Sequence, residues 1–376
     1  PVANGAVQVL SVGDGYEQQA ISVMTELQRL AGLVPGWNWA DAAVIGRNWK
    51  SLSPVRNYCE LHGIPVQSAA DELGNLWRYR EVQALVDELR AADTKLVDAT
   101  TLRNLLSVRG GGPHWAALRE AVEDYGLDTG EQEQPLDHFL EWLVDWCRSV
   151  HHRQTGLLLL SAHRAKGLEF EHIAVIDGDW VRPSRGEDPD APRRLYYVAM
   201  TRAKQSLLLA RMDNRAHPLD GIESAPGLIF RQSERPKSIP AALYRLHKRA
   251  KLSEVDLSFA GRFKSGNKIH RSIERLQPGD PLELRQQDEK WELFDRSGAL
   301  VGRMARAFEL PSEWQCRETS VAAVVTRGEA DSLPEYQQYI RSPKWEVVVP
   351  QFVLEPKVAG NSTKQPAGRR AKSHRR

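Results

Sequence analysis

The sequence predicts an α/β fold: a parallel-sheet domain with a helical insert, followed by a small, mostly β module and a basic tail. Three observations support this. Short apolar runs alternate with helical segments in 1–68 and again in 151–217, the pattern of parallel α/β folds. Between 69 and 150 the strands stop, and apolar side chains recur at helical spacing. Beyond 218, short strand-like segments are separated by turn residues.

The individual elements follow from apolar runs and their spacing. Runs bounded by glycine or turn residues predict strands, and apolar residues at i, i+3 and i+4 predict helices. Ser53 and Pro54 are expected to begin a helix, as its cap and its first position. In the α/β domain we expect strands at 6–12, 42–46, 156–161, 172–177 and 207–211, a short strand after Gly63, and helices at 16–31, 53–62 and 193–201.

The insert and the module follow by the same reasoning. In the insert we expect helices at 77–92, 100–108, 115–125 and 136–150. In the module we expect a basic helix at 240–252 and strands at 282–285, 291–295, 300–303, 322–327 and 345–349. The predicted domains are 1–68 with 151–217 for the parallel sheet, 69–150 for the insert, 218–356 for the basic helix and β module, and 357–376 for a disordered tail.

The composition is that of an ordinary globular protein, with 41% hydrophobic residues, 27% charged residues and a net charge of +2. It contains no run of about eighteen apolar residues and no signal-peptide pattern, so we expect no membrane span and a cytoplasmic location. Cys59, Cys147 and Cys316 share no metal-ligand spacing, and we expect reduced, buried or partly buried thiols. Because the chain begins at Pro1, we expect a piece of a longer protein or a processed product.

Positive charge gathers in 231–275 and in the tail after Lys357, which contains no acidic residue. Such clusters suit a polyanionic partner, although a solvated surface would explain the tail equally well. Arg262 and Lys264 stand among aromatic residues, a mixture that can track a nucleic-acid backbone and stack its bases. They are therefore candidate DNA contacts. The alternative is a structural or protein-docking β module.

Two blocks of sequence carry the chemistry. Residues 161–170 read Ser-Ala-His-Arg-Ala-Lys-Gly-Leu-Glu-Phe and follow a buried strand, whose carboxyl end is where α/β folds place ligands. Within this block, Gly167 permits a sharp turn. Residues 193–203 read Arg-Arg-Leu-Tyr-Tyr-Val-Ala-Met-Thr-Arg-Ala. Two arginines near the start of a helix oppose its dipole, so we expect them to have an anionic partner.

In this order the blocks resemble motifs V and VI in the second motor domain of UvrD/Rep/PcrA-type superfamily 1 DNA helicases. The resemblance covers about 5–215 and implies a RecA-like domain 2A with a reduced 2B-like insert. It implies that Ser161 and His163 contact single-stranded DNA. It also implies three roles toward ATP. Glu169 accepts a hydrogen bond from the ribose, Lys166 and Gly167 form the turn that couples the nucleotide to the DNA strand, and Arg202 is the arginine finger.

A third segment, 43–48, resembles motif IV, which implies that Arg47 reaches the γ-phosphate of ATP. The chain departs from the family upstream of Arg193, where relatives usually carry consecutive glutamates and this chain has Asp190-Ala191-Pro192. This departure puts the local salt bridges in doubt.

The sequence contains no Gly-Lys dipeptide and therefore no phosphate-binding loop of the form G-x-x-x-x-G-K-[ST]. Val86-Asp87-Glu88 imitates an Mg²⁺-binding strand end, but it lies within the helical pattern of 77–92. We therefore expect an N-terminal motor domain, in the same longer protein or in a partner chain, to hold ATP and Mg²⁺. This chain would complete the ATP site and grip single-stranded DNA with 3′–5′ polarity, and would be inactive alone. The alternative is a non-catalytic, helicase-like DNA-binding or regulatory module.

Overall fold

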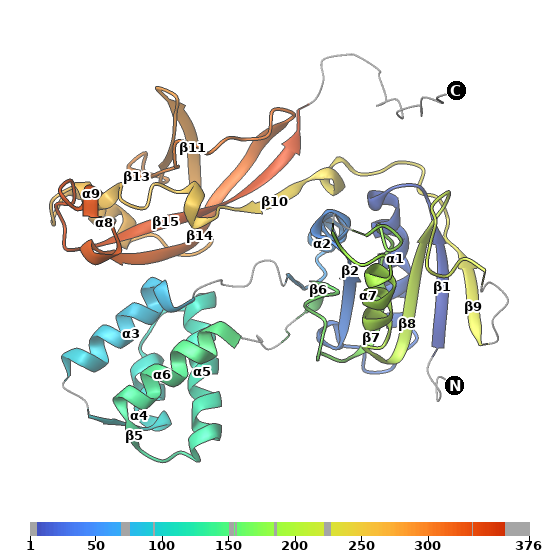
Figure 1. Cartoon of the computed structure of the whole chain (residues 1–376), viewed down its shortest axis with the longest axis horizontal. Coiled ribbons are helices and arrows are strands. Elements are labelled where there is room, and N and C mark those ends of the chain that lie inside the picture. Colours follow the sequence, from blue (N-terminus) through green and yellow to red (C-terminus); the bar gives the residue numbers. More distant parts are fainter. Residues whose placement is uncertain are drawn as a thin grey trace.

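The computed structural model confirms the α/β class (Figure 1). A seven-stranded parallel sheet, a group of helices and a separate six-stranded antiparallel sheet make up the chain. In the described part, no helix combines the length and apolar character needed to cross a membrane. The structure describes residues 6–68, 76–92, 95–149, 154, 156–183, 186–221, 227–332 and 334–357, so the expected basic tail from 358 onward lies outside it.

The seven strands have the order β3-β6-β2-β7-β8-β1-β9, and every pairing is parallel. All strand carboxyl ends therefore share one edge of the sheet. The expected strands are present, and β9 is an additional strand at the outer edge. The bounds are β1 Ala6–Val12, β2 Ala42–Gly46, β3 Val66–Ser68, β6 Leu157–Ser161, β7 Phe170–Val175, β8 Ala203–Met212 and β9 Leu228–Gln232.

Helices cover both faces of this sheet. Helices α1 (Tyr16–Ala31) and α2 (Trp49–Leu61) share a hydrophobic core with one face, and α7 (Ala191–Met200) shares a core with the other. Helix α2 begins four residues before the expected start. The Asn48 side chain caps it by accepting a hydrogen bond from the backbone N–H of Ser51 at 3.2 Å, and Pro54 lies inside the helix. The prediction of Ser53 as cap was therefore wrong, because Asn48 offers a cap one turn earlier.

The insert is helical, as predicted. Its first segment differs from the single helix expected over 77–92, because a 3₁₀ turn comes first and Tyr79 is extended before α3 begins at Arg80. Two very short strands, β4 and β5, pair with each other. The bounds are η3 Leu76–Arg78, α3 Arg80–Ala91, β4 Leu96–Val97, α4 Ala99–Ser107, α5 Pro113–Thr129, β5 Gln134–Pro135 and α6 Leu136–Ser149.

The C-terminal module is an antiparallel sheet with the order β10-β15-β14-β11-β12-β13. The five predicted strands are present, and β14 and β15 are much longer than expected. A short helix, α8 (Lys268–Glu274), lies before β11. The bounds are β10 Leu246–Arg249, β11 Pro281–Gln287, β12 Lys290–Phe294, β13 Leu300–Arg303, β14 Trp314–Gly328 and β15 Lys344–Pro356.

The basic helix predicted over 240–252 is absent from these described residues. The segment forms a 3₁₀ turn, η4 (Ala241–Tyr244), then strand β10, then a second 3₁₀ turn, η5 (Leu252–Glu254). Strand β10 pairs with residues 351–354 of β15. The prediction was wrong because this long-range pairing overrides the local helical spacing.

The insert and the β module are built around one continuous hydrophobic core. Tyr79 of the insert forms a β-bridge with Val325, and its hydroxyl accepts a hydrogen bond from the Arg249 side chain. Arg80 donates hydrogen bonds to the carbonyl oxygens of Glu274, at 3.1 Å, and of Leu276. The predicted residue limits of the domains remain a prediction, but the insert is packed firmly against the module.

The segment that leads into the module is docked on the parallel-sheet domain. The Asn57 side chain of α2 donates hydrogen bonds to the carbonyl oxygens of Leu243, at 2.9 Å, and Arg245, at 2.8 Å. Its amide oxygen lies 2.8 Å from Nε2 of His247. A single buried asparagine thus fixes the start of β10 on α2.

Candidate functional site

The candidate residues of the parallel-sheet domain fall into two groups, at opposite edges of the sheet. Ser161 ends β6 and Arg47 directly follows β2, so both lie at the carboxyl edge. Glu169 directly precedes β7 and Arg202 directly precedes β8, so both lie at the amino edge. The pairing of Phe170 with the residue after Arg202 brings the last two together.

The segment 162–169 crosses from one edge to the other. The backbone N–H of Ala165 donates to the Ser161 carbonyl at 3.1 Å, and Gly167 takes a left-handed φ of +86°, as its position in the motif predicted. Ala165 is fully buried, whereas His163 and Lys166 are exposed. The turn therefore exposes the His163 ring and the Lys166 ammonium group to solvent, while its buried alanines anchor it.

At the amino edge, Arg202 makes hydrogen bonds with uncharged groups. Its Nε donates to the Val198 carbonyl at 3.0 Å, and its terminal nitrogens contact the Leu168 carbonyl and the Thr201 hydroxyl. In the described residues no carboxylate lies within ion-pair distance of Arg202. The carboxylate of Glu169, next to it in the fold, is exposed and is 3.5 Å from Nζ of Lys204. This edge therefore holds a guanidinium without a counter-ion beside an accessible acceptor.

The arginines at the start of α7 have an internal explanation. Arg194 forms an ion pair with Asp188 at 2.6 Å, on the loop just before the helix. The Asp190 backbone N–H and the Arg194 guanidinium together hold the pKa of the Asp188 carboxyl below its usual range. Arg193 is exposed. For Arg194, the expected anionic partner is thus a neighbouring side chain.

Arg47 lies at a different kind of position. Its guanidinium donates hydrogen bonds to the carbonyl oxygens of Asp179 and Arg182 and to the Glu187 carboxylate, at 3.0 Å, and its side chain is only 10% exposed. It lies between the carboxyl ends of the neighbouring strands β2 and β7, at the edge where open α/β sheets commonly bind ligands. In this structure its donors hold the loop after β7.

Arg47 and Arg202 are not brought together, contrary to the expectation that both complete one ATP site. One follows a strand and the other precedes a strand of the same parallel sheet. A strand of five residues separates the two edges by about 16 Å. The resemblance gave the order of the two arginines along the chain. The edge at which each arginine lies depends on whether it precedes or follows its strand.

Comparison with known proteins identifies the region that holds both blocks. Residues 116–214 match the family model of the UvrD-like helicase C-terminal domain. These residues are therefore similar to the C-terminal domain of UvrD-like helicases. The match covers 161–170 and 193–203 and confirms the resemblance that these blocks predicted.

Two curated proteins that match parts of this chain are helicases by name. The putative ATP-dependent DNA helicase YjcD of Bacillus subtilis (strain 168) is 41% identical over 86 residues, which are 19% of this chain and 11% of the relative. The ATP-dependent DNA helicase PcrA of Staphylococcus aureus (strain Mu50 / ATCC 700699) is 26% identical over 187 residues, 46% of this chain and 24% of the relative. The matched part of the chain thus spans between about a tenth and a quarter of the length of these relatives.

Outside the matched region, the two candidate DNA contacts of the β module differ. Arg262 forms a two-pronged ion pair with Asp256, whereas Lys264 is exposed. Phe259 is buried, and its ring packs edge-on against Phe263 with centroids 5.5 Å apart. Phe259 therefore faces the core, a placement that its position next to cations in the sequence did not reveal. Contact of Arg262 and Lys264 with DNA stays a prediction.

The three cysteines are free thiols, as predicted: Cys59 and Cys147 are buried and Cys316 is partly buried. Burial raises the pKa of both Cys59 and Cys147 to about 12, which keeps them protonated and unreactive. Among the described residues no group of three His, Cys, Asp or Glu side chains could hold a metal ion.

Sequence reasoning missed a buried carboxylate at the carboxyl edge of the parallel sheet. Asp177, two residues after β7, accepts a hydrogen bond from the Met212 backbone at 2.8 Å, and its own backbone is held on both sides by Gln19. Burial raises the pKa of this carboxyl. An aspartate directly after a buried strand was the available signal. Its bonds fasten β7 to β8 and to α1.

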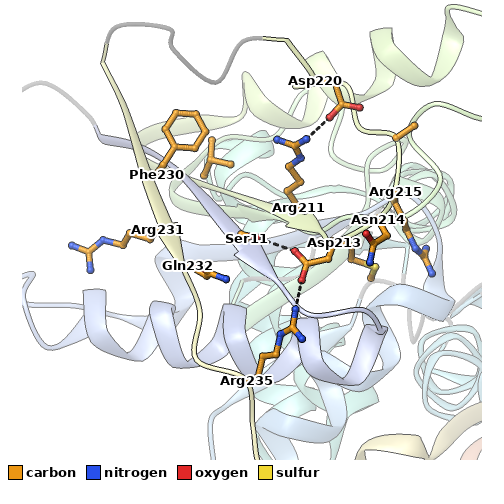
Figure 2. Close-up of a pocket in the computed structure, with 13 residues that line it drawn as sticks. Ser11, Arg211, Asp213, Asn214, Arg215, Asp220, Phe230, Arg231, Gln232 and Arg235 are labelled. Carbon is orange, nitrogen blue, oxygen red and sulfur yellow. Dashed lines mark hydrogen bonds and ion pairs between the residues drawn. The ribbon is translucent and has the colours of Figure 1, made fainter.

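Sequence reasoning also missed a pocket of 860 Å³ at the carboxyl ends of β8, β1 and β9. Figure 2 shows Asp213 at its centre, where it accepts hydrogen bonds from Ser11, at 3.0 Å, and Arg235, at 2.9 Å. Arg211 turns away toward Asp220, at 2.7 Å. Two of the pocket's arginines are thus neutralised by carboxylates. Part of the pocket is formed by β9, which the sequence did not predict.

Proposed function

We propose that this chain is the C-terminal part of an ATP-dependent DNA helicase. Its amino edge would close over ATP held by another motor domain, and its carboxyl edge would grip single-stranded DNA. The observation that carries this proposal is the segment 162–169, which joins Ser161 at one edge to Glu169 at the other in eight residues. The family match and the names of the relatives support it.

At the nucleotide edge, the proposal gives Arg202 the part of the arginine finger. A guanidinium stabilises negative charge that spreads over a γ-phosphoryl group during transfer, a contribution of about 10³–10⁵ in rate. Because Arg202 has only neutral hydrogen-bond partners among the described residues, it can turn to an anion without breaking an ion pair. The exposed Glu169 carboxylate would accept a hydrogen bond from the ATP ribose.

The phosphate loop and the ligands of Mg²⁺ would come from an N-terminal motor domain, in the same longer protein or in a partner chain. When bound there, Mg²⁺ would neutralise charge on the β- and γ-phosphates. The residues of this chain would orient the nucleotide from the opposite side, with Lys166 and Gly167 in the turn that connects it to the DNA. The predicted contact of Arg47 with the γ-phosphate is not part of this proposal, because Arg47 follows β2 at the opposite edge of the sheet from Arg202.

At the DNA edge, Ser161 and His163 would contact the strand, and Arg262 and Lys264 would add a second contact in the β module. The crossing segment is short and anchored by buried alanines. A displacement of Glu169 when ATP binds would therefore move Ser161, because the short segment between them cannot change its conformation enough to take up the movement. The 3′–5′ direction of movement is part of the proposal through the family resemblance.

The decisive experiment uses the longer protein or complex that includes the N-terminal motor domain. Arg202→Ala should lower ATP turnover by about 10³-fold or more while ATP affinity changes only a few-fold. Arg202→Lys should recover little, because an ammonium group cannot make planar two-point contacts. Arg193→Ala, an exposed arginine on the adjacent α7, is the matched control and should behave as wild type. Retained turnover in Arg202→Ala would remove the finger assignment.

A second candidate function is a non-catalytic, helicase-like DNA-binding or regulatory module. One observation favours it: the first turn of α7 holds Ala191 and Pro192 and no acidic residue, where the family usually has glutamates. The isolated chain should show negligible ATP turnover under either proposal. The longer protein separates them, because a helicase hydrolyses ATP when DNA is present and a regulatory module does not.

A further inference from the structure

The β module carries a stripe of exposed cations on and beside α8. Lys268, Arg271 and Arg275 stand at i, i+3 and i+7 and therefore share one helical face. Lys264 lies one turn earlier, joined by a hydrogen bond from the Asn267 backbone to the Lys264 carbonyl at 3.0 Å. In the part of the chain that the structure describes, none of the four cations forms an ion pair. Hereafter these four residues are the α8 stripe.

The α8 stripe rests on a rigid base. The opposite face of the helix is buried through Ile269 and Ile273, and the Asn267 side chain caps its start. From the insert, Arg80 donates hydrogen bonds to the carbonyl oxygens of Glu274 and Leu276 at its end. A seven-residue helix would be marginal alone, so these contacts hold the cations in a fixed row.

The charge of the surface suits a polyanion. Between 262 and 275, Glu274 is the only acidic residue in the sequence. From Lys268 to Arg275 the helix rises about 10 Å, and over that length a DNA duplex presents about six phosphates on its two strands. A duplex therefore offers the row a denser line of charge than a single strand does.

The two phenylalanines that precede the α8 stripe in the sequence are packed against other side chains of the module. Proteins that hold single strands commonly stack bases on aromatic side chains. Phe259 is buried under the Arg303 guanidinium, and Phe263 packs edge-on against Phe259. The α8 stripe itself consists of lysines and arginines only, which suits contacts to phosphates rather than stacking on bases.

We propose that the α8 stripe binds the phosphate backbone of duplex DNA, as a site separate from the single-strand edge of the parallel sheet. The choice of DNA among polyanions rests on the proposed function; the site itself rests on the charge and shape of the module. Such a surface would hold duplex without regard to sequence, because phosphate contacts carry no base information.

The test measures binding of the whole chain to a fluorescein-labelled blunt duplex and to a single strand of equal length, by anisotropy over a salt series. The quadruple variant Lys264→Ala, Lys268→Ala, Arg271→Ala and Arg275→Ala should bind duplex about tenfold or more weakly at about 0.1 M salt. The slope of log Kobs against log salt should flatten by about 0.9 for each phosphate that the variant no longer neutralises. Single-strand affinity should fall by a clearly smaller factor than duplex affinity, about threefold at most, because only Lys264 of the four residues also belongs to the proposed single-strand grip.

Two variants keep the test independent of folding. The first variant replaces each lysine of the stripe by arginine and each arginine by lysine. It preserves the charge and should preserve duplex binding. The matched control removes four other exposed cations of the module that have no ion pair among the described residues: Lys290→Ala, Arg296→Ala, Arg306→Ala and Lys357→Ala. It should bind duplex as wild type does.

Unchanged duplex affinity in the stripe variant, or an equal loss in the control, would overturn the proposal. So would a stripe variant that keeps duplex binding but loses binding to a polyglutamate peptide, since the partner would then be an acidic protein. His163→Ala in the same assay tests the single-strand edge. If His163→Ala leaves single-strand binding intact while the stripe variant loses duplex, the proposed function fails at that edge and the α8 stripe stands.

Discussion

At the scale of single residues, Arg47 shows why a position in a motif does not settle what a side chain does. Its guanidinium satisfies two carbonyl oxygens and one carboxylate of the loop after β7, and little of it meets solvent. A group with this many internal acceptors stabilises the fold wherever it lies. The effect of Arg47 on ATP turnover therefore has to be measured separately from its effect on the stability of the fold.

We expect Arg47→Ala to lower the free energy of unfolding by about 1–3 kcal/mol, because it leaves a carboxylate and two carbonyl groups without their donor. Arg47→Lys should recover less than half of this loss, since one ammonium group cannot reach all three acceptors. Urea unfolding of the isolated chain measures both. If stability is unchanged while turnover in the longer protein is lost, Arg47 is a phosphate sensor and not a loop anchor.

His217 is a second residue with a measurable consequence. It is buried against the edge of Tyr196, and its Nδ1 accepts a hydrogen bond from the Leu219 backbone at 3.2 Å. Burial lowers the pKa of His217 to about 4. In the unfolded chain the pKa is about 6.5. Between these values the unfolded state binds more protons than the folded state.

The free energy of unfolding should therefore fall as pH drops from about 6.5 to about 4, by about 2–3 kcal/mol from His217 alone, and then level off. His217→Gln should remove this part of the pH dependence. Unfolding by urea at about pH 7 and about pH 4.5, in both proteins, gives the difference. Equal pH dependence in the two proteins would show that His217 does not contribute.

At the scale of elements, local patterns predicted what local forces determine. The apolar runs of β1, β2 and β6 and the helical spacing of α1 and α3–α6 lie within single segments, and those elements were predicted. The segment 240–252 was not, because its strand exists only by pairing with β15, about a hundred residues later. Strand β9 was missed because its side chains, among them Ile229 and Phe230, are exposed and lack the usual alternation.

The candidate site divides in the same way. The order and spacing of the two blocks predicted the family, and Gly167 has the backbone conformation expected of its turn. The placement of Arg47 away from Arg202 could have been derived from the predicted strands, since one residue follows a strand and the other precedes one. That Phe259 faces the core could not, because its burial depends on Arg303 and Phe263 around it.

At the scale of the whole molecule, the chain has two parts: the parallel-sheet domain, and the insert packed together with the β module. Polar contacts of Asn57 join the first part to the second. The parallel sheet holds the module through Asn57, and the insert holds it through a shared core in which α3 lies against β14. Arg80 is central to the second part. It lies 3.5 Å from the Glu346 carboxylate, whose pKa is raised by burial, and it also caps α8.

We expect Arg80→Ala to speed hydrogen–deuterium exchange in α3 and in α8 together, because one guanidinium serves both elements. The free energy of unfolding should fall by about 1–3 kcal/mol. Arg78→Ala, which removes the more exposed ion pair with Asp331, is the control and should cost less than about 1 kcal/mol. Faster exchange in α3 alone would show that the insert and the module are not coupled through Arg80.

The core shared by the insert and the β module also affects the order in which the chain can fold during synthesis. Asp87 of α3 and Lys344 of β15, which contact each other, are 257 residues apart. A ribosome would therefore finish the insert long before it makes the strands against which the insert packs. Contacts of such sequence separation form late, and apolar surface left waiting for them invites aggregation. The helices in the middle of the chain depend for their final burial on nearly the last residues that the structure describes.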